Sequence, residues 1–143
     1  MNTIKSNENI TSIDIHNNTL SNKMKTIPGI LSALSNIIHL NLSDLTFEDR
    51  NIIKNIFEIL PKLNELREFY FEYNISDIDF DDKEKKAFVS ELFEYLLKVK
   101  NLKELHIRNN DIPKDIYNKY LPKFKNKGLY LFSCYSEEEK END

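Results

Sequence analysis

Apolar and polar residues alternate in several short stretches of the chain, and wider apolar spacings follow each stretch. In residues 101–110, NLKELHIRNN, the apolar residues Leu105 and Ile107 alternate with polar neighbours. This period of two is typical of a strand with one buried face. Between such stretches apolar residues recur every three or four positions, which predicts amphipathic helices over residues 52–60, 88–97 and 116–124.

One spacing, L-x-x-L-x-L-x-x-N-x-L, recurs along the chain. Copies begin at Ile10, Ile37, Leu66 and Leu102, and a degraded fifth copy includes Leu129. The first and fourth copies match throughout. The second has leucine at the asparagine position, and the third has serine at the last apolar position. Four good copies indicate a repeat protein rather than chance similarity.

The repeat resembles that of leucine-rich repeat proteins over residues 10–136. Intervals of 27, 29, 36 and 24 residues between copies are similar to those of the ribonuclease-inhibitor-like subclass, in which a full helix follows each strand. The resemblance implies an α/β fold: a short solenoid with a parallel curved sheet of about five strands on its concave side and helices on its convex side. The strands are expected near residues 12–16, 39–43, 68–72, 104–108 and 128–132.

Three parts are expected along the chain: an N-terminal cap over residues 1–9, the repeat domain over 10–136, and an acidic tail over 137–143. The tail holds five acidic residues and one lysine, whereas the preceding 136 residues hold 19 acidic and 19 basic side chains. A neutral body is poorly suited to neutralising phosphates, so a nucleic-acid partner is not expected.

No targeting or membrane segment is expected. The first twenty residues are polar, and no apolar run approaches the ~18 residues of a membrane span. The single cysteine fits a reducing compartment. An intracellular, cytoplasmic location is therefore expected.

Helix starts and a polar insertion are also readable. Thr46 and Asp81 are expected as helix N-caps, and Pro113 suits a first helical turn. Residues 77–84 begin like a calcium-binding loop but lack its glycine and its twelfth-position glutamate. We interpret them as a polar insertion that ends in the helix cap at Asp81, and whether it contributes to binding stays open.

Asparagines follow three of the strands at one repeat position. Asn18, Asn74 and Asn110 are expected to hydrogen-bond the backbone of neighbouring turns. Cys134 is expected to take the same position with weaker bonds. Their expected role is structural.

The sequence lacks the motifs of the common nucleotide-binding enzymes and hydrolases. With glycine only at positions 29 and 128, neither a P-loop nor a G-x-G-x-x-G turn is possible, and no G-x-S-x-G occurs. His16 and His39 should lie ~13 Å apart along adjacent strands, and His106 lies two strands further on, so no metal site is expected. We therefore expect no catalysis, cofactor or metal.

Residues between the buried leucines should face outward on the concave surface. The central column is expected to contain Tyr70, His106 and Tyr130 as a contiguous aromatic row. Glu72 and Arg108 should be neighbours, and Glu68 beside Glu104 would be a like-charge contact. The candidate partner-binding residues are Asp14, Asn41, Glu68, Tyr70, Glu72, Tyr73, Glu104, His106, Arg108, Tyr130 and Phe132.

Aromatic residues edged by charges are typical of protein interfaces, although tyrosine is also an ordinary strand former. The favoured hypothesis is a non-catalytic module that binds a partner protein on the concave face. The alternatives are a self-associating unit, with a homodimer through the end strand or contacts through the convex helices, and a regulator of a partner enzyme such as a GTPase.

Overall fold

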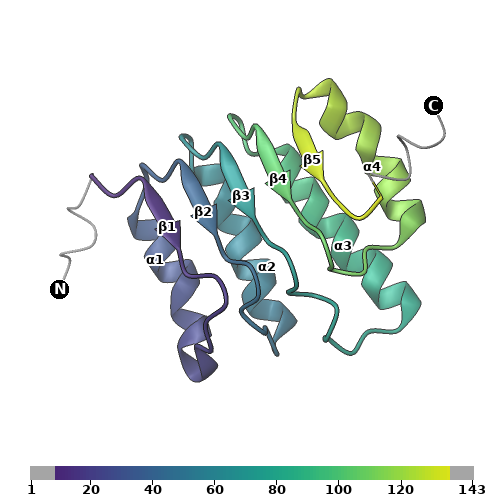
Figure 1. The fold of residues 1–143 in the computed structure, drawn as a ribbon, viewed down its shortest axis with the longest axis horizontal. Helices are drawn as coiled ribbons and strands as arrows, with labels where there is room; N and C mark the ends of the chain where they lie inside the picture. The colour runs from purple at the N-terminus through teal and green to yellow at the C-terminus, as the bar shows by residue number, and fades with distance from the viewer. Residues whose placement is uncertain (1–8, 136–143) are drawn as a thin grey trace.

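Five parallel strands and a layer of helices form the chain, as the sequence predicts (Figure 1). The computed structural model describes residues 9–135, so the expected acidic tail and nearly all of the expected N-terminal cap lie outside the described residues. The strands pair in chain order: β1 (Ser12–Asp14), β2 (His39–Asn41), β3 (Glu68–Tyr70), β4 (Glu104–His106) and β5 (Tyr130–Phe132).

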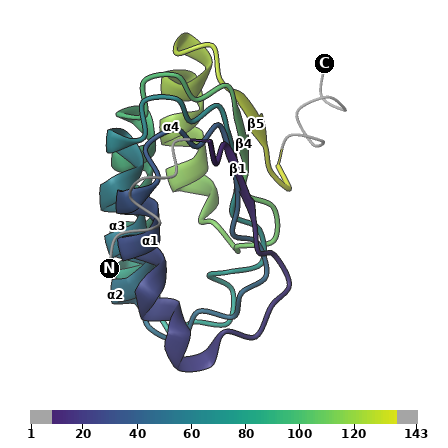
Figure 2. The same cartoon turned by 90° about the vertical axis from the view of Figure 1, so that its left-hand side faces the viewer.

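The helices lie together on one side of the sheet and leave the opposite side open (Figure 2). They are η1 (Ser21–Thr26), α1 (Ile27–Ala33), α2 (Arg50–Ile59), η2 (Leu60–Lys62), α3 (Asp82–Leu97) and α4 (Lys114–Asn126). Because every helix of residues 9–135 is on that side, the outward positions of the strands face solvent on the concave side.

The core fills the space between sheet and helices. Leu40, Phe69 and Leu105, one from each central strand, are fully buried. Phe57 of α2 meets the rings of Phe69 and Phe71 edge-on, with centroids 5.5 and 5.0 Å apart. Burying each such side chain contributes about 1.5–3 kcal/mol, so this inward apolar face fixes which residues point outward.

The two predicted helix caps had different outcomes. Asp81 is the N-cap of α3, where its Oδ1 accepts a hydrogen bond from the Glu84 N–H at 2.7 Å. The prediction for Thr46 was wrong, because Asp49 caps α2 by accepting from the Asn51 N–H at 2.9 Å. Thr46 lies in a left-handed turn, and the chain buries the next residue, Phe47, before the helix begins.

Buried asparagines join the turns that follow the strands, as predicted. Asn110 is buried: its Oδ1 accepts from the N–H groups of Asn74 and Ile75 at 2.7 and 3.1 Å, and its Nδ2 donates to the carbonyls of Phe71 and Ile107. Asn74 makes equivalent bonds to the preceding turn, accepting from the Leu45 N–H and donating to the Leu42 carbonyl. These amides supply bonds that the irregular backbone lacks.

Asn18 and Cys134 differ from the buried pair. The prediction for Asn18 was wrong: it is exposed, and its Nδ2 donates to carbonyls of its own turn, those of Ile15 and His16. Cys134 makes the expected weak bond to a neighbouring turn, since its exposed thiol accepts from the Asn109 N–H at 3.4 Å, but its predicted position was wrong: the register of β5 places it two residues before the asparagine position.

The register of β5 explains this difference. Leu131, rather than Leu129, pairs with Leu105, so the last strand is shifted by two residues from the predicted alignment. Gly128 has a φ of +76° just after α4, and the N–H groups of Gly128 and Leu129 bond back to the carbonyls of Lys125 and Phe124. This Schellman turn ends the helix abruptly and leaves three residues before β5, against six between α3 and β4.

Candidate functional site

Two rows of side chains cross the open face of the sheet. The strand register aligns Ser12, His39, Glu68, Glu104 and Tyr130 in the first row and Asp14, Asn41, Tyr70, His106 and Phe132 in the second. Eight of the eleven candidate residues therefore lie in these rows. Glu72, Tyr73 and Arg108 follow the ends of β3 and β4.

Stacked rings make up the C-terminal half of the second row. Tyr70 and His106 stack with centroids 3.9 Å apart and planes 9° apart, and His106 and Phe132 stack at 4.2 Å and 1°. His39, from the first row, meets Tyr70 at 5.2 Å in a tilted arrangement. We call these four residues the aromatic ladder.

The predicted aromatic row is corrected at its last member. Because β5 is shifted by two residues, Phe132 takes the position expected for Tyr130. Tyr130 instead pairs with Glu104 in the first row, where it is 71% exposed. The shift of two keeps both rings on the concave side, since alternate residues of a strand share a face.

Two carboxylates, Glu68 and Glu104, lie side by side in the first row, and we call them the carboxylate pair. The side chains are 40% and 35% exposed. His39 Nδ1 lies 2.8 Å from Glu68 Oε2, and His106 Nε2 lies 4.0 Å from Glu104 Oε2. The pair therefore has two histidine neighbours: His39 lies beside Glu68 on β2, and His106 lies in the second row on β4.

The two carboxyl groups titrate differently. The hydrogen bond with His39 lowers the pKa of Glu68. Partial burial, followed by hydrogen bonding and repulsion from Glu68, raises the pKa of Glu104. Burial also lowers the pKa of His106, which favours its neutral form. The free site thus resists a second negative charge at Glu104.

The remaining polar candidates have local or electrostatic roles. Asp14 hydrogen-bonds His16, and this bond lowers the pKa of its carboxyl group. Asn41 Oδ1 accepts from the Ser43 N–H at 3.0 Å. Burial raises the pKa of Glu72, and the positive charge of Arg108 opposes that rise.

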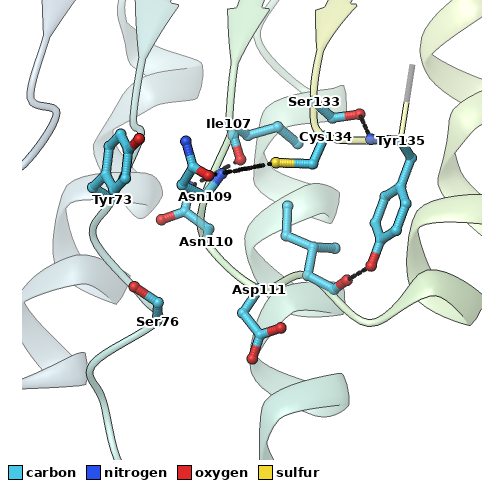
Figure 3. Close-up of a pocket in the computed structure, with 10 residues that line it drawn as sticks. Tyr73, Ser76, Ile107, Asn109, Asn110, Asp111, Ser133, Cys134 and Tyr135 are labelled. Carbon is cyan, nitrogen blue, oxygen red and sulfur yellow. Dashed lines mark hydrogen bonds between the residues drawn. The ribbon is translucent and has the colours of Figure 1, made fainter. Parts of the chain in front are cut away.

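A pocket of about 420 Å³ opens where β4 and β5 end, next to the two rows (Figure 3). Tyr73 and Tyr135 lie on opposite sides of it. The Tyr135 hydroxyl donates to the Ile112 carbonyl at 2.6 Å and fixes that wall. The lining residues are Tyr73, Ser76, Ile107, Asn109, Asn110, Asp111, Ile112, Ser133, Cys134 and Tyr135.

Sequence reasoning anticipated only Tyr73 among the pocket residues, and Tyr73 is unusual in its backbone. Its φ is +56°, and the equivalent positions after β1, β2 and β4, also left-handed, are Asn17, Asp44 and Asn109. Asparagine and aspartate tolerate this conformation, whereas a bulky residue is strained in it. Tyr73 is also 54% exposed, so core burial does not account for its presence. In the sequence, the feature that could have indicated the pocket is this aromatic residue at a turn position that holds asparagine or aspartate after β1, β2 and β4.

Searches with the sequence found no matching family model and no matching curated protein. Within residues 9–135, no helix combines the length and the apolar character required to cross a bilayer. Among solved structures the chain is similar to the tropomodulin C-terminal domain from Caenorhabditis elegans, with a TM-score of 0.70 and 12% sequence identity. The match covers 89% of this chain and 74% of that one. This likeness, together with the five-strand topology, establishes a fold of the leucine-rich repeat type.

Proposed function

We propose that the chain is a non-catalytic protein-binding module that holds a partner protein against the concave face of its sheet. The observation that carries the proposal is the aromatic ladder, which lies on a face that no helix of residues 9–135 covers. A solenoid sheet of this kind offers an extended concave binding surface.

The composition of the face supports a protein partner. Tyrosine, phenylalanine and arginine are enriched at interfaces, and contact energy concentrates in a few rigid aromatic residues. Tyr73 and Tyr130 are the two most exposed large hydrophobic side chains of the described residues. We assign the partner contacts to the aromatic ladder, these two tyrosines and the carboxylate pair.

The pocket beside the ladder would receive one large side chain of the partner. Its volume fits an aromatic or branched apolar residue, and Tyr73 and Tyr135 provide ring walls. The strain at Tyr73 supports this assignment, because an unfavourable backbone conformation is often retained at binding sites. We also propose the ribonuclease-inhibitor-like subclass, since an α-helix follows each of β1 to β4, and an intracellular location.

The test is affinity purification of partners from the cells that make the protein, with the Tyr70→Ala/Tyr130→Ala variant beside the wild type. Hot-spot aromatics contribute about 2 kcal/mol or more each, so capture should fall by about 30-fold or more. Ile30→Ala/Asn118→Ala, which changes exposed residues of α1 and α4, is the matched control and should capture as the wild type does. Equal capture by the wild type and the tyrosine variant would refute the proposal.

Self-association is the second candidate, and the edge position of β5 favours it. β5 pairs with β4 on one side only, so its other edge could pair with a second copy of the chain. Light scattering over a concentration series would show a dimer, and a dimer lost in Leu131→Lys would support this candidate. A monomer at every concentration excludes it.

A further inference from the structure

We infer that the concave face takes a basic segment of its partner, with an arginine side chain seated between the carboxylates of Glu68 and Glu104. This inference rests on the proposed function, because it names the chemistry of the partner at the same face. It commits to one occupant, a cationic protein segment.

The charge of the concave face complements that of a basic segment. The residues of the two rows, with Glu72 and Arg108 directly after them, carry the carboxylates of Asp14, Glu68, Glu72 and Glu104 and one guanidinium, that of Arg108. An approaching segment therefore meets a negative surface, which attracts positive charge and repels acidic competitors. Tyr70 and Phe132 of the ladder offer planar aromatic rings, on which a guanidinium stacks.

The carboxylate pair provides a binding site for a guanidinium. Like charges directly opposite on neighbouring strands destabilise a free sheet, and the register places Glu68 directly opposite Glu104. A guanidinium has five N–H donors in one plane and binds carboxylates in a bidentate manner. One arginine could therefore donate to both groups and replace their repulsion by attraction. Lysine, with a compact ammonium, would satisfy the pair less well.

Two tyrosine rings lie beside the carboxylate pair. Tyr130 pairs with Glu104 along the first row and is largely exposed, and Tyr70 follows Glu68 by two residues on the same face. A cation between the carboxylates would thus lie beside two tyrosine rings. Cation–π contacts contribute about 0.5–2 kcal/mol when the cation is within ~6 Å of a ring centre.

Proton competition supports the same site. The raised pKa of Glu104 means that this group binds a proton more readily than an ordinary glutamate. The titratable groups around the pair are His39 from β2, Tyr70 from β3, His106 from β4 and Tyr130 from β5, and Arg108 acts on His106. Acidification neutralises Glu104 and protonates His106, and both changes weaken the attraction for an arginine. Binding should therefore weaken as the pH falls through the range in which glutamate titrates.

Selection from a phage-displayed library of random dodecapeptides tests the inference. The wild type should enrich peptides that contain arginine, and a synthetic copy of an enriched peptide should bind the Glu68→Gln/Glu104→Gln variant about 10-fold or more weakly. Glu48→Gln/Glu65→Gln, which removes two exposed glutamates outside the rows, should bind within about twofold of the wild type. Replacing the peptide's arginine by lysine should give an intermediate affinity.

The outcomes separate this inference from the proposed function. Enriched peptides without basic residues, or binding unchanged by the double glutamine variant, would overturn the basic-segment inference. The proposed function would then stand if Tyr70→Ala/Tyr130→Ala still abolished binding, and it would fail with the inference if that variant bound normally or no peptide were enriched. Glu104→Gln alone keeps the His39–Glu68 contact and provides a second variant if the double change lowers stability.

Discussion

The convex and concave surfaces of this solenoid differ in how their charged side chains are arranged. On the convex side, opposite charges of neighbouring helices pair: Arg50 with Glu84 at 2.8 Å, Lys54 with Glu91 at 3.1 Å and Lys86 with Asp115 at 2.9 Å. On the concave side, the carboxylate pair sets like charges in register. Neighbouring helices thus match opposite charges on the convex side, whereas on the concave side an added cation would offset the repulsion within the carboxylate pair.

The same contrast holds for aromatic side chains. Residues on the helices direct their rings inward, as Phe57, Phe93 and Phe124 do. On the open face the rings of Tyr70, His106 and Phe132 stack on one another and remain partly exposed. A stack of partly exposed rings beside like charges supports the proposed contact with another molecule.

The largest expected effect separates the two sides of the sheet itself. Phe69→Ala removes a fully buried ring and should lower the free energy of unfolding by about 3–5 kcal/mol. Its neighbour Tyr70 faces outward, so Tyr70→Ala should cost about 1–2 kcal/mol, mainly the lost stacking. Urea denaturation of both variants measures this. Equal losses would show that Tyr70 belongs to the core.

The next effect compares buried with exposed asparagines. Asn110→Ala leaves four backbone groups without their partner and should cost about 2–4 kcal/mol. Asn18→Ala serves as the control and should cost about 0.5 kcal/mol or less, because Asn18 is exposed to water. Thermal unfolding of the two variants gives the comparison. A cost for Asn18→Ala as large as that for Asn110→Ala would contradict this account of the asparagine position.

A smaller effect of opposite sign is expected at the pocket. Tyr73→Asn places in the left-handed turn the residue type found at Asn17 and Asn109, so unfolding should become about 1 kcal/mol more costly. Partner binding should weaken in the same variant, because a pocket wall is lost. Tyr130→Asn is the control, with no such gain in stability. A loss of stability for Tyr73→Asn would contradict this explanation, because it would show that contacts of the tyrosine ring stabilise the turn.

The smallest effects compare single glutamates of the two surfaces. Glu91→Gln breaks a convex ion pair and should cost about 0.2–0.5 kcal/mol near pH 7. Glu104→Gln removes a like-charge contact and should add a few tenths of a kcal/mol (about 0.2–0.5). Because the folded-state pKa of Glu104 is raised, its contribution to stability is present at acid pH and is lost as the pH rises through the glutamate range. The advantage of Glu104→Gln should therefore vanish in acid, and chemical denaturation at both pH values detects this. An advantage independent of pH would contradict the assignment.

Sequence patterns predicted most of the fold because the inward leucines, isoleucines and phenylalanines fix which side of each strand is buried. The register of β1 to β4 followed from that pattern. The register of β5 did not, because it depends on how α4 ends, and one glycine in a left-handed turn shortens the connection. The exchange of Tyr130 for Phe132 in the aromatic ladder is a direct consequence.

The candidate site was only partly predictable for a related reason. Outward positions on a strand can be counted in a repeat, so the carboxylate pair and Tyr70 were identified. The pocket is formed by turns from three repeats, and its shape depends on how those turns pack. Tyr73 had a readable signal, as an aromatic residue at a position where the turns after β1, β2 and β4 have asparagine or aspartate.

The most direct test of the central claim is a map of amide chemical shifts in ¹⁵N-labelled protein during titration with a peptide obtained from the library selection. Shifts should concentrate in residues 39–43, 68–73, 104–109 and 130–135, and the amides of the outer helix surfaces should remain unchanged. Shifts concentrated on α1 to α4, with the strand amides unmoved, would contradict a binding role for the concave face.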